Sequence, residues 1–430
     1  MSPALQPCLS ACGPPHTTRT CGPARPTRAR SLVLAVMLAA GCQSDGVSSA
    51  DPFSADPWTV SGPEVRIGSL DDPVYIFASV ERLALSPDGL LHSLHPDEAT
   101  IRQWTAEGTP AGSFGRAGEG PGEFVIPYNM GFFGDSLWVW DVLRSRASYF
   151  DPGGEFLGSV SAMVGLGGPD GSTLRPVRPY RDGSFLGMEF PSLDRVARGQ
   201  LTRTPFVLMD AEGNTQSHIW MQPHEPRDVL ALLRADGTGG RYASQPFGDD
   251  VLPTDIAHGV LAVERRAWTG DGEAIVSVTG IGFTGDTLFA SRIPYTPTPL
   301  PSARVDSVVR ATGERMHPSM SRREPGLAIG TLEEDIRRAI YAPAYLPAVA
   351  EVAVAEDGNI WLRRFDPFVS ETGEQMNEWW VLDPAGNPLA RSLTPAGLRV
   401  MLIRDDAVWG IERDELDVEY IVRHRLVKRG

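Results

Sequence analysis

The sequence repeats one pattern of short strands between residues 63 and 430. Each unit has an apolar strand, a tight turn, a second strand, a gap, a third strand that ends near an aromatic and an acidic residue, a Gly turn and a fourth strand. The first unit reads VERLALSPDGLLHSL and then TIRQWTAEGTPAGSFG (within 80–115), and the fifth reads AVAEVAVAEDGNIWLRR and then EWWVLDPAGNPLARSL (within 348–393). Asp-Gly pairs supply the positive φ angles that two-residue hairpin turns require. The repeat therefore predicts antiparallel sheets of four strands.

Four-stranded antiparallel units that repeat radially form a β-propeller, so we predict an all-β propeller. Residues 163–179, 223–251 and 296–347 interrupt the repeat, and the remaining length gives six blades of about 45 residues, close to the ~40–50 of known propeller repeats. The last unit has three strands of its own, and EVRIGSL (64–70) is an unpaired strand near the start of the domain. We expect these N- and C-terminal strands to close the ring. The fourth unit, within 258–293, follows the pattern least.

The segment FGRAGEGPGEF (114–124) joins the first two units. It resembles the blade connection FGxxGxGPGEF of NHL-repeat-like six-bladed propellers, many of which are bacterial lipoproteins of unknown role. The repeat similarity covers residues 63–162 and 348–430 best. The resemblance implies a fold and a compartment, whereas it implies no reaction, because propellers host many functions. We expect the loop to carry the chain between blades, with Glu123 accepting backbone hydrogen bonds, rather than to bind a ligand through its charged side chains.

An apolar run, SLVLAVMLAAGC (31–42), follows the arginine-bearing start of the chain. The run is too short to span a bilayer and has the length of the h-region of an export signal. Its end, LAAGC, resembles the lipobox of bacterial lipoproteins, which implies that residues 1–41 are a signal peptide and that Cys42 is acylated after cleavage. The other interpretation is a plain signal peptide. Residues 42–62 are rich in Ser, Asp, Gly and Pro and are expected to form a flexible tether.

These features predict an exported protein of the cell envelope. The other three cysteines (Cys8, Cys12 and Cys21) precede Cys42, so the mature chain would have no disulfide and its stability would come from its core. Gln43 after the lipidated cysteine, rather than Asp, favours an outer-membrane location that faces the periplasm or the cell surface. The partner expected from this part of the chain is the membrane, through the lipid anchor.

Charge and residue types exclude several function classes. Beyond residue 41 the chain has 35 basic against 54 acidic side chains, a net charge of −19, which repels phosphate backbones and excludes nucleic-acid binding. Lys428 is the sole lysine, so Walker P-loop and Schiff-base chemistry are excluded. The position of the cysteines excludes zinc ribbons, iron–sulfur clusters and cysteine nucleophiles in the repeat region.

Polar residues on the first strand of each unit are expected to face the central channel. We place Glu81, Asn129 and Glu351 there as candidate ligand-binding residues. The architecture is similar to that of lactonases and strictosidine-synthase-like hydrolases, and this resemblance implies calcium bound by Glu, Asn and Asp oxygens at the channel. Three candidates fall short of the ~6–8 oxygens that calcium takes, so the alternative is a set of solvated channel residues and no cofactor.

Histidine and serine motifs give no support for a hydrolytic site. His92 and His95 are three residues apart on one strand, a spacing that sends them to opposite faces and prevents a shared metal site. The sequence contains neither HExxH nor GxSxG.

The insertion at 296–347 is predicted to be helical. SARVDSVVRAT and TLEEDIRRAIY read as helices, the second with a Thr331–Glu334 capping box. The loop between them carries the candidate ligand-binding residues Arg322 and Arg323, which favour an anionic partner. PRDVLALLRADG (226–237) is a third expected helix. Long insertions of repeat scaffolds often carry binding functions, and the alternative is that they cover hydrophobic surface.

Together these patterns predict an exported, lipid-anchored β-propeller that acts as a binding or protein-interaction module. Its expected ligand is a protein, a peptide or a glycan. The alternative is a calcium-dependent extracytoplasmic hydrolase or lyase of the lactonase or strictosidine-synthase-like type. The sequence favours a protein that is not an enzyme, because it shows no complete catalytic constellation.

Overall fold

A computed structural model describes residues 52–53, 56–166, 173–233, 240–248, 251–264, 274–322, 326–365, 368–369 and 373–428. All of them belong to the unit Ser49–Gly430. The signal-peptide and lipidation predictions, with Cys42, lie outside the described residues.

Most described strands form sheets of consecutive antiparallel neighbours, as the repeat predicts. The first sheet has the order β2-β3-β4-β5, the second β6-β7-β8-β9, the third β10-β11-β12-β13-β14 and the fourth β17-β18-β19-β20. The bounds are β2 (Arg82–Leu85), β3 (Leu91–His95), β4 (Thr100–Trp104), β5 (Pro110–Phe114), β6 (Pro127–Phe133), β7 (Ser136–Asp141), β8 (Arg146–Phe150), β9 (Phe156–Ser161), β10 (Gly165–Leu166), β11 (Thr173–Pro179), β12 (Phe185–Met188), β13 (Arg203–Met209), β14 (Thr215–Pro223), β17 (Val251–Ile256), β18 (Gly259–Glu264), β19 (Ala274–Gly282) and β20 (Thr287–Tyr295).

The last two repeat units join in one nine-stranded sheet. Its path is β21-β22-β24-β25-β1-β28-β27-β26, with β23 beside β24. The join is a short parallel pairing of β1 with β25 at Trp58↔Ser392 and Thr59↔Leu393. The strands are β1 (Trp58–Ile67), β21 (Val349–Val354), β22 (Ile360–Arg364), β23 (Phe368–Val369), β24 (Gln375–Leu382), β25 (Pro388–Pro395), β26 (Arg399–Arg404), β27 (Ala407–Arg413) and β28 (Glu419–Val427).

The predicted pairing of the chain ends is observed. β1 runs antiparallel to β28, from Thr59↔Val427 to Ile67↔Ile421. The strand begins at Trp58, within the segment expected to be a tether, because the Trp58 side chain is 8% exposed and packs 6.2 Å from the ring of Trp361. The segment before β1 also contributes to the core, since Phe53 stacks on Trp380 at 5.4 Å.

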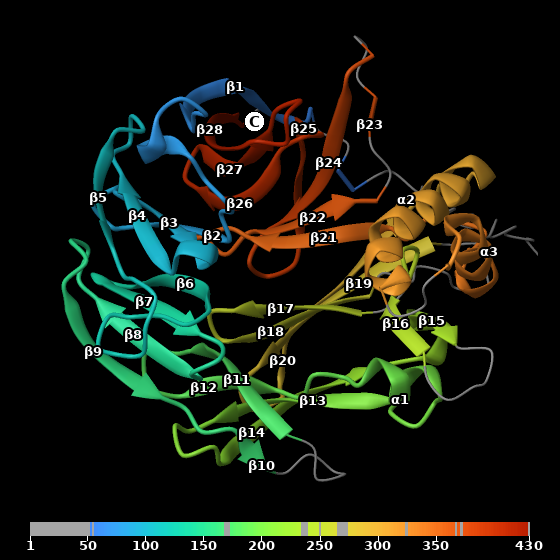
Figure 1. Cartoon of the computed structure of the whole chain (residues 1–430), viewed down its shortest axis with the longest axis horizontal. Helices are drawn as coiled ribbons and strands as arrows, with labels where there is room; N and C mark the ends of the chain where they lie inside the picture. Colours follow the sequence, from blue (N-terminus) through green and yellow to red (C-terminus); the bar gives the residue numbers. More distant parts are fainter. Residues whose placement is uncertain are drawn as a thin grey trace, which may run out of the picture. The chain divides into compact units, whose positions relative to one another are not determined.

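The sheets have a propeller-like arrangement (Figure 1), in which strands such as β2, β6, β17 and β21 lie towards the middle and β5 and β9 lie outside. Six separate blades were expected, and the structure instead has four separate blade-like sheets and the nine-stranded sheet. The physical reason is the β1–β25 pairing, which fuses the last two four-stranded groups.

The core lies between neighbouring sheets. Leu94 and Ile101 of the first sheet pack with Leu137 and Val139 of the second, and all four are fully buried. Equivalent clusters fill the other interfaces, where alternate strand residues point to opposite faces of a sheet. Burial of such side chains is worth about 1.5–3 kcal/mol each, so the sheets are held mainly by their faces.

Two parts of the repeat differ from expectation. The fourth unit is fully paired as β17–β20, although its sequence follows the pattern least. Residues 173–179, predicted to belong to an insertion, form strand β11 of the third sheet. The described part of the helix expected at 226–237 is not an α-helix: residues 226–228 form the 3-10 turn η3 (Pro226–Asp228), and β15 (Val229–Leu233) pairs with β16 (Gly240–Ser244).

Two helices occupy the insertion at 296–347, as predicted: α2 (Ser302–Ser321) and α3 (Ile329–Ala339). α2 is longer than expected and includes residues 313–321 of the segment predicted to be a loop (313–326). A Cβ at Gly313 would lie 2.9 Å from Cγ of Glu333, so this glycine allows the helices to approach closely. The Thr331–Glu334 capping box is wrong, since the N-cap of α3 is Ala328. In the described part of the chain, no helix is long and apolar enough to cross a membrane.

His92 and His95 lie on opposite faces of β3, as predicted. The ring of His92 contacts Phe132, and the ring of His95 contacts Phe77. His95 Nδ1 donates to the Ser79 carbonyl at 3.0 Å, so Nε2 of the neutral ring accepts from Ser93 Oγ at 2.8 Å. His95 is 1% exposed, and burial lowers its pKa to about 4.

The connecting loop at 114–124 is organised by its own charged side chains. Glu123 accepts from the backbone N–H of Gly120 at 2.8 Å, which confirms the predicted backbone contact, and its carboxylate pairs with Arg116 at 2.6 Å. Arg146 donates to the Glu119 carbonyl at 3.0 Å. These contacts assign the loop a structural role between the first two sheets.

Candidate functional site

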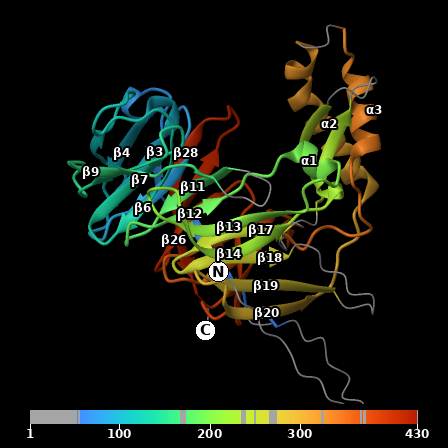
Figure 2. The same ribbon diagram turned by 90° about the horizontal axis from the view of Figure 1, so that it is seen from below.

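The inserted helices and the inserted strand pair that the structure describes all leave the sheets at one end. The short helix α1 (Leu193–Ala197) connects β12 to β13, the β15–β16 pair connects β14 to β17, and α2 and α3 connect β20 to β21. In a four-stranded antiparallel sheet, the turn between the second and third strands lies at the same end as the start of the first strand and the end of the fourth. We call this end of the sheets the insertion end. Figure 2 shows α1, α2 and α3 on the same side of the sheets.

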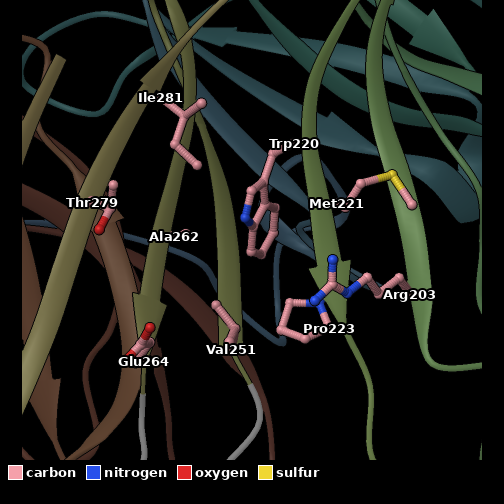
Figure 3. A pocket seen from close by; sticks show the side chains of 9 residues that line it. All are labelled: Arg203, Trp220, Met221, Pro223, Val251, Ala262, Glu264, Thr279 and Ile281. Atoms are coloured by element: carbon pink, nitrogen blue, oxygen red, sulfur yellow. The ribbon is translucent and has the colours of Figure 1, made fainter. Parts of the chain in front are cut away.

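A cavity of about 380 Å³ lies between the third and fourth sheets. Four of its residues stand at strand ends, and these ends are at the insertion end: Arg203 begins β13, Pro223 ends β14, Val251 begins β17 and Glu264 ends β18. The volume is within the ~300–1,000 Å³ range of small-molecule sites. The complete lining is Arg203, Trp220, Met221, Pro223, Val251, Ala262, Glu264, Thr279 and Ile281 (Figure 3).

The cavity walls are apolar and held in place. Ala262 and Ile281 are almost fully buried, and Trp220 is half-buried against the ring of Phe206 at 5.7 Å. Gln222 Nε2 donates to the Val251 carbonyl at 3.3 Å, a bond that links β14 to β17. The two sheets therefore form a fixed wall of aliphatic and aromatic side chains.

Four polar groups of the lining have no hydrogen-bond or ion-pair partner among the residues that the structure describes. They are the Arg203 guanidinium, the Glu264 carboxylate, the Thr279 hydroxyl and the indole N–H of Trp220. In Figure 3, Arg203 and Glu264 lie on opposite sides of the cavity, with Trp220 between them. An apolar cavity with a few available polar groups is the usual composition of a small-ligand site.

The predicted channel residues do not line this cavity, and each of them contacts an arginine side chain. Asn129 Oδ1 accepts from Arg82 Nε at 3.2 Å, and Glu81 lies 3.8 Å from the same guanidinium. Glu351 pairs with Arg363 at 2.9 Å. Glu81 and Asn129 thus meet at Arg82, and no contact joins Glu351 to them in the described ranges.

These contacts bear on the calcium interpretation. An arginine guanidinium beside each oxygen group supplies the positive charge that a cation would otherwise provide. Within the described residues, no group of three His, Cys, Asp or Glu side chains could hold a metal ion. The calcium-dependent enzyme stays a prediction that no feature of these residues favours.

The predicted arginine loop is mostly helix. Arg315 and His317 lie within α2, and His317 Nε2 bonds with the Leu327 carbonyl at 2.9 Å. Arg322, the C-cap residue of α2, is exposed. Arg323 lies outside the described residues. Binding of an anionic partner at Arg322 and Arg323 stays a prediction.

Sequence reasoning missed the cavity. Its lining comes from five strands in two sheets, and each side chain alone reads as an ordinary strand residue. The available signal was the position of Arg203 and Glu264 at the ends of strands beside insertions. That signal can be used only when it is known which residues of the third sheet face which residues of the fourth.

Comparison with models of protein families and with curated proteins finds no match. Among solved structures, a protein from Bacteroides fragilis is similar with 11% identity and a TM-score of 0.42, covering 87% of this chain and 97% of that one. A member of the DUF4221 family from Bacteroides vulgatus has 10% identity and a TM-score of 0.39, covering 87% and 99%. The PQQ-bound aldose sugar dehydrogenase of Streptomyces coelicolor has 12% identity and a TM-score of 0.37, covering 86% and 100%. Likeness at this level carries no inference about ligand or activity.

Proposed function

We propose that this protein is an exported, lipid-anchored six-bladed β-propeller that binds a small ligand in the cavity between its third and fourth sheets. The observation that carries the proposal is the cavity itself, with its fixed apolar wall and four available polar groups. Because the insertions leave the sheets at the end where Arg203 and Glu264 stand, we expect them to lie near the approach to the cavity.

Six blades are supported by contacts that link each four-stranded group to the next. The last group consists of β26, β27, β28 and β1. In order around the arrangement, the contacts are Arg82 with Asn129, the Met163 N–H with the Ala211 carbonyl, Arg178 with Asp255, Ser291 with the Gly386 carbonyl, the Glu356 N–H with the Ile403 carbonyl, and Arg404 with the Ser86 carbonyl. The final contact returns to the first sheet, which supports counting the fused sheet as two blades of a closed ring.

Attachment to the membrane is proposed from the lipobox-like LAAGC motif. Changing Cys42 to Ser should move the protein from the membrane pellet to the soluble fraction, because the serine hydroxyl cannot take the thioether-linked lipid. Cell fractionation and immunoblotting would measure this, with Ser44→Ala as the matched control that stays in the pellet. Retention of the Cys42→Ser protein in the pellet would contradict a lipid anchor.

Ligand binding in the cavity can be tested by thermal stabilisation. A library of amino acids, dipeptides and sugars would be screened, since a ligand that binds the folded state at about 100 times its Kd adds ~2.7 kcal/mol to the free energy of unfolding. Trp220→Ala should abolish the shift, because it removes the aromatic wall of the cavity. Leu157→Ala, on the outer strand β9 and 56% exposed, should leave it unchanged. A library without a Trp220-dependent hit would refute the proposal.

A further inference from the structure

The two charged groups of the cavity are not paired with each other. Elsewhere on the sheets arginines meet acids directly, as Arg178 does with Asp255 and Arg363 with Glu351. Arg203 and Glu264 line one cavity, yet neither side chain has a hydrogen bond or an ion pair with any described residue. Figure 3 shows why they do not meet, since they extend from strands of different sheets with the cavity between them.

Opposite charges on two sides of an apolar cavity constrain the ligand. A guanidinium recognises a carboxylate through paired N–H donors, and a carboxylate recognises an ammonium group. Arg203 and Glu264 are both exposed, so each is hydrated in the free protein, and a ligand with one charge would gain a charge-assisted contact on one side only. Charge complementarity therefore favours a ligand that carries both an anionic and a cationic group.

The part of the ligand between these charges must be apolar. Trp220, Val251 and Ile281 provide an aromatic and aliphatic surface, and Thr279 provides one hydroxyl. Burial of an aliphatic side chain on such a surface contributes favourably, whereas a sugar would leave most of its hydroxyl groups without partners.

From these observations we infer that the cavity binds a short zwitterionic peptide with apolar side chains, its carboxylate at Arg203 and its ammonium group at Glu264. The inference rests on the proposed function, because it names the ligand class of the same cavity. It also gives each charged residue a separate and testable role.

The test uses the full chain and four forms of one dipeptide, measured by isothermal titration calorimetry. They are leucyl-leucine, its N-acetyl form, its C-terminal amide and the doubly blocked neutral form. Leucyl-leucine should bind, and blocking either end should weaken binding about tenfold, a usual effect of losing one charge-assisted contact.

Two substitutions connect each end of the peptide to one residue. In Glu264→Gln the free and N-acetylated peptides should bind alike, while the amide remains weaker. In Arg203→Gln the free and amidated peptides should bind alike, while the N-acetyl form remains weaker. When blocking one end of the peptide no longer weakens binding to a variant, the result isolates the contact between that end and the substituted residue. Arg310→Gln and Glu107→Gln, at exposed positions on α2 and on the β4–β5 turn, are matched controls. In both of them, blocking either end of the peptide should still weaken binding.

The outcomes distinguish an error in the ligand class from an error in the binding site itself. The zwitterion inference would be overturned if the neutral form bound as well as leucyl-leucine. It would also be overturned if blocking either end weakened binding to Glu264→Gln and to Arg203→Gln as much as it does in the wild type. Failure of leucyl-leucine to bind would also overturn it. In either case a Trp220-dependent hit of another class in the thermal screen would preserve the proposed binding site, and its absence would refute both.

Discussion

Removal of residues 1–67 should lower the free energy of unfolding by roughly 6–12 kcal/mol. The truncation deletes four buried side chains, Phe53 and the β1 residues Trp58, Val65 and Ile67, each worth about 1.5–3 kcal/mol. It also leaves β28 with an unpaired edge from Val427 to Ile421. Since whole domains are stable by only ~5–15 kcal/mol, the remaining chain would be marginal. Urea denaturation followed by circular dichroism measures the change.

The matched control removes residues 1–51 and retains Phe53 and β1. This shorter truncation should keep the urea midpoint of the full chain, because every described strand and the Phe53–Trp380 stack remain. Equal midpoints for the two truncations would show that the β1–β28 pairing does not stabilise the fold.

The second large effect is expected from acid. Burial in the first sheet lowers the pKa of His95 from 6.5 to about 4. The unfolded chain therefore binds a proton that the folded chain does not bind between these values, so stability is full above pH 6.5 and falls as the pH drops towards 4. The shift corresponds to a loss of about 3 kcal/mol from this one group. Burial also lowers the pKa of His92, which acts in the same direction.

His95→Gln isolates this contribution. The variant should be less stable at pH 7, because the bonds with Ser79 and Ser93 are altered. Between pH 6.5 and 4, however, its stability should fall less steeply than that of the wild type, by up to ~1.4 kcal/mol per pH unit. Urea midpoints at several pH values measure both slopes. Parallel slopes would show that His95 does not couple stability to pH.

Local sequence signals predicted the strands well where turn chemistry and apolar alternation agree. The Asp-Gly turns placed β2 next to β3 and β21 next to β22, and EVRIGSL was correctly paired with the last strand. The helices of the 296–347 insertion also followed from their pattern. These signals are local in the sequence, or follow from the last repeat unit lacking one strand.

The predictions were wrong where tertiary contacts determine the local structure. The apolar run at Val229–Leu233 fits a helix or a strand, and its pairing with Tyr242 and its neighbours makes it a strand. Trp58 lies in a Ser- and Pro-rich segment, yet its ring packs on Trp361, some 300 residues along the chain. The cavity depends on how two sheets face each other, which no single strand encodes.

The pairing of β1 with β28 also dictates the order of events during biosynthesis. His424 Nδ1 bonds with the Ser61 carbonyl across 363 positions of sequence. β1 thus lacks β28 as a partner until almost the whole described chain has been made, and closing so long a loop is slow. Until then Val65 and Ile67 are uncovered, and the open strand edge can pair with another chain. Incomplete translation products of this protein should therefore aggregate, whereas the completed chain can close on itself.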